Sequence, residues 1–374
     1  CAQYIGQKNY EKANMSARQV LFIITAISVA VSAVCLIFQK PLLRFIFGAV
    51  EADVMRASET YFFFTALSFP FIAAYDSAAS IFRAQENTKG PMTISMISNV
   101  MNIGGNAILI WVFHLGVAGA ALSTLVSRIF CAVVVLYQLR KDRQPIVVRD
   151  YLKIRPDWGM IKRILGLGIP SGVENSMFQL GKLAIQSTVS TLGTTAIAAQ
   201  AMTNILENLN GIAAIGVGVG LMTIVGQCLG TGRKDEAVYY IKKLCVIAEF
   251  VIIASCLVVY ILARPVTILG GMEKESAAMC IHMITWITIV KPLVWTMGFV
   301  PGYGLRAAGD VKFSMITSCC TMWACRFCLC VFLIRVMDFG PMGVWIGMFA
   351  DWTVRGIIFT WRFHSRKWLE HKVI

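Results

Sequence analysis

Apolar residues gather into long stretches along the chain, and short polar segments separate these stretches. A helix of about 20 apolar residues crosses a hydrocarbon core of about 30 Å, and backbone amides in lipid must be hydrogen-bonded within their own segment. The pattern predicts ten helical spans, at roughly 19–39, 57–82, 92–113, 117–138, 164–190, 197–228, 239–262, 277–303, 313–334 and 341–361. The predicted fold class is therefore all-α, a polytopic membrane protein.

Composition and charge agree with a membrane protein. Only 14% of the residues are charged and 57% are hydrophobic, which leaves too few charged side chains to cover a soluble enzyme of 374 residues. The net charge of +14 would suggest nucleic acid in a soluble protein, but 23 of the 34 Lys and Arg residues lie on one side of the predicted spans. By the positive-inside rule both ends of this chain lie in the cytoplasm, at the inner (plasma) membrane, with no nucleic-acid partner.

Twelve cysteines could suggest a metal site. Most of them lie within apolar stretches, and no histidine or second CxxC accompanies the group between Cys319 and Cys330. They are interpreted as small apolar residues, and no metal is expected.

The sequence contains an internal repeat. Cys1-Ala-Gln-Tyr-Ile-Gly6 recurs as Val225-Gly-Gln-Cys-Leu-Gly230, and Gly116-Val-Ala-Gly119 recurs as Gly340-Pro-Met-Gly343, both at an offset of 224 residues. An even number of predicted spans separates Cys1 from Val225, so both copies enter the membrane in the same direction. The repeat is predicted to be parallel, with an axis along the membrane normal.

The repeat also predicts the domains. Residues 1–140 form an N-lobe with about four spans, residues 141–160 form a cytoplasmic linker, and residues 161–374 form a C-lobe with about six. The second copy begins near Lys162, about 63 residues before the point that matches Cys1, and the chain does not begin with methionine. We therefore expect two further spans before Cys1 and twelve in the intact protein.

Several blocks, in this order and spacing, carry a resemblance to a known family. They are Gln3–Gly6, Phe82-Arg-Ala84, Leu115–Ala120, Gly166–Pro170, Val225–Gly230 and Gly343-Val-Trp345 through Arg362–Trp368. The chain resembles the multidrug and toxic compound extrusion family, which belongs to a superfamily with lipid-linked oligosaccharide flippases. The resemblance implies two six-helix lobes in a V, a substrate cavity between them, and export of amphipathic, often cationic, organic compounds. An inward H⁺ or Na⁺ gradient would drive export without another cofactor, in a monomer.

Two alternatives stay open. A flippase for a lipid-linked substrate would share the scaffold, but it should place several basic residues in its cavity. Lys182 and Lys291 are available, yet acids and amides accompany them, which favours cationic substrates. An integral-membrane enzyme or a scaffold is the remote alternative. The four histidines belong to no clustered motif of the kind that such an enzyme needs.

Polar residues on the span that follows Pro170 are the main site candidates. At 100° per residue, Asn175, Gln179, Lys182 and Gln186 fall within about 60° of one another and form one stripe. Such a stripe cannot face lipid, so it is predicted to line the cavity between the lobes. Glu174 lies at its edge, either as a residue that binds the coupling ion or substrate, or in an ion pair with a basic neighbour such as Lys182.

Other ionisable residues at membrane depth are weaker candidates. Asp76, Glu207 with Asn204, and Lys291 could each serve the ion or substrate path, and Lys291 needs an acidic partner or water if it is buried. Asp351 and Arg355 form a predicted structural pair in the last span. In sodium-coupled relatives an acidic residue lies where this chain has Phe178, and proton-coupled bacterial relatives carry a key aspartate in the first span. By this resemblance, the chain carries neither of those two acidic residues at the corresponding place.

Overall fold

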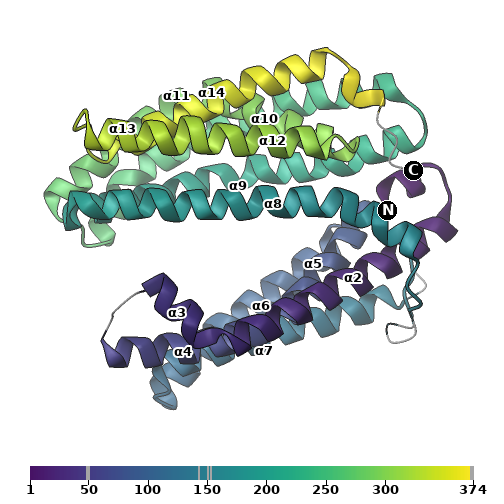
Figure 1. Cartoon of the computed structure of the whole chain (residues 1–374), viewed down its shortest axis with the longest axis horizontal. Coiled ribbons are helices and arrows are strands. Elements are labelled where there is room, and N and C mark those ends of the chain that lie inside the picture. Colours follow the sequence, from purple (N-terminus) through teal and green to yellow (C-terminus); the bar gives the residue numbers. More distant parts are fainter. Residues whose placement is uncertain (48–50, 142–143, 150, 152–153, 371–374) are drawn as a thin grey trace. The chain divides into compact units, whose positions relative to one another are not determined.

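The computed structural model describes residues 1–47, 51–141, 144–149, 151 and 154–370, and over these residues every element is a helix (Figure 1). The chain divides into two compact units, Cys1–Ile164 and Leu165–Ile374. Residues 142–143, 150 and 152–153 of the predicted linker lie outside the described part.

The first unit packs its helices around a small apolar core. Its elements are α1 (Ala2–Gly6), α2 (Tyr10–Ile37), α3 (Gln39–Phe47), α4 (Ala52–Leu67), α5 (Phe69–Ala84), α6 (Lys89–Ala107), the π-helix η1 (Ile108–Val112) and α7 (Gly116–Leu139). Asn9 caps α2 by accepting a hydrogen bond from the Lys12 amide at 3.1 Å. Leu21, Phe82 and Val135 bring α2, α5 and α7 together in the core.

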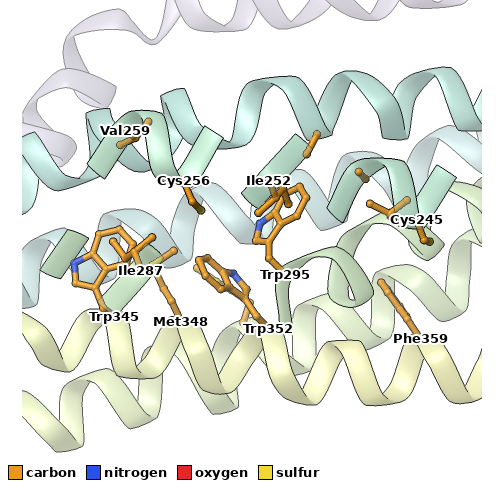
Figure 2. Packing of buried hydrophobic residues seen from close by; sticks show 14 of the residues in the cluster. Cys245, Ile252, Cys256, Val259, Ile287, Trp295, Trp345, Met348, Trp352 and Phe359 are labelled. Atoms are coloured by element: carbon orange, nitrogen blue, oxygen red, sulfur yellow. The ribbon is translucent and has the colours of Figure 1, made fainter. Parts of the chain in front are cut away.

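The second unit has longer helices. They are α8 (Trp158–Val189), η3 (Ser190–Leu192), α9 (Thr194–Gly230), α10 (Lys234–Leu269), α11 (Lys274–Ala307), α12 (Val311–Thr321), the π-helix η4 (Met322–Cys328), α13 (Leu329–Arg335), α14 (Met342–His364) and η5 (Lys367–Glu370). Helices α9, α10, α11 and α14 pack against one another. Trp345, Met348, Trp352 and Phe359 project from one face of α14 into this core (Figure 2). The core therefore follows the helical repeat of α14.

Seven described helices are long and apolar enough to cross a membrane, or eight if the bent pair α4 and α5 forms one span. The sequence predicted ten, and the two that fall short are α8 and α14. Both carry charged residues that are buried inside the protein: Glu174 in α8, and Asp351 with Arg355 in α14. Their polar faces lower the mean hydropathy although the helices have the length of a span.

The predicted span 57–82 is broken at Ser68, where α4 and α5 meet at 41°. Pro70 lies two residues further on, and a proline lacks the amide hydrogen that would continue the helical hydrogen bonds. Arg128 of α7 donates a hydrogen bond to the Ser68 hydroxyl, and this hydroxyl donates to the Thr65 carbonyl at 2.6 Å. Pro292 lies inside helix α11, which continues through it.

The backbone repeats with the sequence. Left-handed residues occur at Lys8 and Gly232, with φ of 56° and 79°, and at His114 and Asp338, with φ of 53° and 52°. Gly116 is the first residue of α7 and Gly340 lies two residues before α14, with φ of 54° and 58°. All three pairs have the offset of 224 residues found in the sequence. The parallel repeat therefore includes the chain reversals between helices.

Two glycines set the close approach of α11 and α14. A Cβ added at Gly298 would lie 3.0 Å from the Trp352 carbonyl oxygen, and one at Gly356 would lie 3.4 Å from the Gly298 amide. Small residues of this kind let helix backbones approach in membranes.

We expect Gly298→Val to lower the free energy of unfolding by about 1–3 kcal/mol, because its side chain must push the two backbones apart. The measurement is the thermal unfolding midpoint in detergent, followed by tryptophan fluorescence. Gly216→Val in α9 is the matched control, because an added Cβ there meets nothing within 4 Å. Equal midpoints for both variants would contradict the close-packing argument.

Candidate functional site

The polar stripe of α8 lines a cavity of about 740 Å³ in the second unit. Asn175, Gln179, Lys182 and Gln186 all contribute to its wall. Helices α9, α11 and α14 and the π-helix η4 supply the rest, including Asn204, Glu207, Trp295, Phe299, Arg326 and Trp352. All the residues that line it belong to Leu165–Ile374, and the position of this cavity between the lobes stays a prediction.

Glu207 of α9 and Lys291 of α11 form an ion pair at the cavity. The Lys291 ammonium donates to the Glu207 carboxylate at 2.7 Å and to the Glu207 backbone carbonyl at 3.3 Å. The Lys291 side chain is completely buried, whereas 15% of the Glu207 side chain is exposed. Lys291 therefore has the acidic partner that its burial requires, and it neutralises the carboxylate that lines the cavity.

Aromatic rings surround the Lys291 ammonium. It lies 5.5 Å from the centre of the Trp295 ring and 5.9 Å from that of Trp352. Figure 2 shows both tryptophans in the core, Trp295 on α11 and Trp352 on α14. The Trp295 ring also stacks on Phe299, with centroids 4.7 Å apart. Aromatic rings thus line one side of the cavity, where Phe178 and Phe299 are partly exposed and Trp295 and Trp352 are buried.

Glu174 is buried and pairs with Arg306 of α11 rather than with Lys182. The prediction named Lys182 as an example of a basic partner, and the structure corrects it. Lys182 instead lines the cavity with its side chain exposed, and no ion pair or hydrogen bond of its side chain occurs in the described structure. Glu174 does not line the cavity, so it is separated from the stripe that it borders in sequence.

Asp351 and Arg355 form a fully buried pair at 2.8 Å within α14. The Arg355 guanidinium lies 4.8 Å from the centre of the Phe178 ring and 4.9 Å from that of Phe299, and it donates to the Thr321 hydroxyl at 3.2 Å. This one side chain therefore connects α8, α11, α12 and α14 beside the cavity.

Arg326, a charged residue of the cavity wall, was not among the site residues predicted from the sequence. It lies in η4, and in the described structure its side chain makes no hydrogen bond or ion pair, with a buried Nε that has no partner. The signal was present, since an arginine inside an apolar span is unusual. Its direction could not be computed, because a π-helix departs from 100° per residue.

The cysteine-rich segment was considered as a possible metal site because of its sequence. Among the described residues, no three His, Cys, Asp or Glu side chains are placed to hold a metal ion together. The cysteines Cys319, Cys320, Cys325, Cys328 and Cys330 are free thiols on α12, η4 and α13.

Comparison with known proteins decides the family. The MatE family model matches residues 1–108 and 170–332 of the chain. The chain belongs to the MATE family. It is 24% identical over 339 residues to the probable multidrug resistance protein NorM of Thermotoga maritima, covering 88% of this chain and 71% of that relative. It is 23% identical to the probable multidrug resistance protein YoeA of Bacillus subtilis, covering 99% of this chain and 81% of the relative.

Solved structures agree on the MATE fold. A multidrug resistance MATE family transporter of the MOP superfamily, in an outward-facing conformation, matches with a TM-score of 0.87 and 20% identity. The match covers 98% of this chain and 82% of that one. A MATE structure in a straight conformation matches with a TM-score of 0.86, 20% identity and the same coverage.

Two residues named in the sequence analysis, Phe178 and Asp76, lie in different units. Phe178, which stands where the resemblance puts an acidic residue in sodium-coupled members, lies against the Arg355 guanidinium. Asp76 lies exposed on α5 of the first unit, and no ion pair of its side chain occurs among the described residues. Its backbone carbonyl accepts a hydrogen bond from the Ser80 hydroxyl at 2.8 Å. The predicted residues therefore divide between the cavity, the Glu174–Arg306 pair and a separate position on α5.

Proposed function

We propose that this MATE-family chain is a secondary transporter that exports amphipathic organic compounds by alternating access, driven by an H⁺ or Na⁺ gradient. The observation that carries the proposal is the cavity of about 740 Å³, with amides and charges on α8 and α9 opposite aromatic rings of α11 and α14. Binding sites for drug-sized compounds have volumes of about 300–1,000 Å³ and combine apolar walls with a few polar groups.

Burying a charged or polar side chain in the lipid core costs free energy unless the side chain reaches water or a hydrogen-bonding or charged partner. The amides of the α8 stripe lie on the wall of this cavity and not in the packed core. Their place is therefore explained by contact with water, an ion or a transported compound. Three statements stay predictions from the sequence: that the chain lies in the plasma membrane, that both of its ends are cytoplasmic, and that it acts as a monomer.

Glu207 is the carboxylate best placed to couple an ion to this cavity. A proton on Glu207, or a sodium ion bound to it, would compete with the Lys291 ammonium for the same oxygen. Either event would leave Lys291 buried without its counter-charge, which is unfavourable in a low dielectric. A rearrangement of α9 against α11 that relieves this charge would link ion binding to a change in the cavity.

Gradient-driven transport in proteoliposomes tests the proposal. The full-length protein is reconstituted with an imposed pH gradient or, separately, a sodium gradient, and efflux of an amphipathic dye is followed. We expect Glu207→Gln to reduce gradient-driven efflux at least 10-fold, because the glutamine cannot take up the ion. Glu236→Gln is the matched control, since Glu236 pairs with Arg233 on the exposed start of α10.

Dye efflux by Glu207→Gln equal to that of the wild type would remove Glu207 from coupling. Absence of gradient-driven efflux by the wild type, across dyes of either charge, would contradict the proposed transport. Glu174→Gln, assayed in parallel, separates the two buried carboxylates, because Glu174 pairs with Arg306 away from the cavity wall.

A further inference from the structure

The charge of the cavity in the second unit is positive. Its described lining residues include three charged side chains, Lys182, Glu207 and Arg326. The Glu207 carboxylate is already neutralised by the Lys291 ammonium at 2.7 Å. Two cationic groups therefore remain without a counter-charge on the wall, which is the opposite of the sequence-based preference for cationic substrates.

Arg326 forms no ion pair with a carboxylate among the described residues. Asp351 and Glu207 are the carboxylates whose charge acts on it, and they pair with Arg355 and Lys291 respectively. The buried Nε of Arg326 has no hydrogen-bond partner among the described residues. A guanidinium has five N–H donors in a planar fork and accepts nothing, so its free capacity matches a carboxylate, sulfonate or phosphate.

The backbone that carries Arg326 has an unusual helical conformation. Arg326 lies inside the seven-residue π-helix η4, and such turns are rare and frequent at functional sites. Gly347 of α14 packs closely against it, since an added Cβ there would lie 2.8 Å from the Arg326 carbonyl oxygen. The arginine is thus presented to the cavity from a backbone segment that α14 holds in place.

We infer that this cavity binds amphipathic organic anions, with the acidic group between Lys182 and Arg326 and the apolar part against the partly exposed rings of Phe178 and Phe299. The inference rests on the proposed function and names its substrate class. A cation in the same cavity would lie near two uncompensated positive charges and would have to displace Lys291 to reach Glu207. Charge interactions of this kind are strong where the dielectric is low.

Two dyes that share a xanthene ring system but differ in charge test the inference. Fluorescein is an anion at pH 8, and rhodamine 123 is a cation of similar size. Binding to the full-length protein in nanodiscs of phosphatidylcholine is measured by fluorescence anisotropy. We expect fluorescein to bind at least 10-fold more tightly than rhodamine 123, and Arg326→Gln and Lys182→Gln each to weaken fluorescein binding about 10-fold.

The control variants separate charge from folding. Arg326→Lys keeps the charge and should retain most of the fluorescein affinity, while Arg326→Gln should lose it at an unchanged unfolding midpoint. Lys312→Gln removes a basic residue of α12 that does not line the cavity and should leave binding of both dyes unchanged. The inference is overturned if rhodamine 123 binds more tightly than fluorescein, or if folded Arg326→Gln binds fluorescein like the wild type.

The acidic group could belong to a soluble compound or to a lipid headgroup. Phenyl phosphate and dihexanoyl phosphatidylglycerol are therefore compared as competitors of fluorescein, and displacement by either supports an anion site and identifies its source. Proteoliposome efflux of both dyes separates this inference from the proposed function. Efflux of rhodamine 123 without fluorescein would overturn the anion site alone. Charge-dependent fluorescein binding without gradient-driven efflux of either dye would overturn transport and leave the site standing.

Discussion

Lys291→Met is expected to lower the free energy of unfolding of the second unit by about 3–5 kcal/mol. The substitution removes the ammonium that donates to Glu207 at 2.7 Å and leaves a carboxylate with only 15% of its side chain exposed. Methionine has a similar length and is apolar, so loss of volume contributes little. The cost therefore comes from the unpaired charge, and thermal unfolding of the purified protein in detergent measures it.

The matched variant is the double substitution Glu207→Gln with Lys291→Met. Replacing both members of a buried pair is often nearly neutral, because the desolvation cost of both charges disappears with their attraction. We expect the double variant to recover most of the stability that Lys291→Met loses, which is a coupling energy of about 2–3 kcal/mol. If the double variant is as unstable as the single one, the loss comes from packing around Trp295 and Trp352 and not from charge.

The sequence predicted the helices and the stripe because both depend on local periodicity. The length of an apolar stretch predicts a span whatever its neighbours are. Asn175, Gln179, Lys182 and Gln186 lie on a continuous α-helix, so 100° per residue placed them correctly on one face. The ends of the spans were predicted less well, since α10 extends from Lys234 to Leu269 beyond the apolar part of its sequence.

The partners of the charged residues could not be predicted, because they depend on which helices are neighbours. Glu174 pairs with Arg306, 132 residues away, although Lys182 is two turns along the same helix. Glu207 and Lys291 are 84 residues apart, and each was chosen only as a polar residue at membrane depth. Hydrophobic patterns carry no information about this choice. The preference for cationic substrates relied on acids that accompany Lys182 and Lys291, and one of these acids, Glu207, is paired with Lys291.

Arg355→Met is expected to have the second large effect, a loss of about 3–5 kcal/mol in the free energy of unfolding. Asp351 is fully buried, and removal of its partner at 2.8 Å would leave its charge uncompensated. The same substitution removes the contacts of the guanidinium with the Phe178 and Phe299 rings. Because these residues lie on α14, α8 and α11, we expect the variant to loosen the cavity wall as well as the fold.

Arg355→Lys separates the two contributions. Lysine keeps the positive charge beside Asp351 but lacks the flat guanidinium that stacks on aromatic rings and donates to Thr321. We expect Arg355→Lys to keep about half of the stability that Arg355→Met loses. We also expect its fluorescein affinity to be below that of the wild type, because Phe178 and Phe299 line the cavity. Stability equal to that of Arg355→Met would assign the whole effect to the stacked geometry. Full stability and dye binding in Arg355→Lys would show that charge alone holds α8, α11 and α14 around the site.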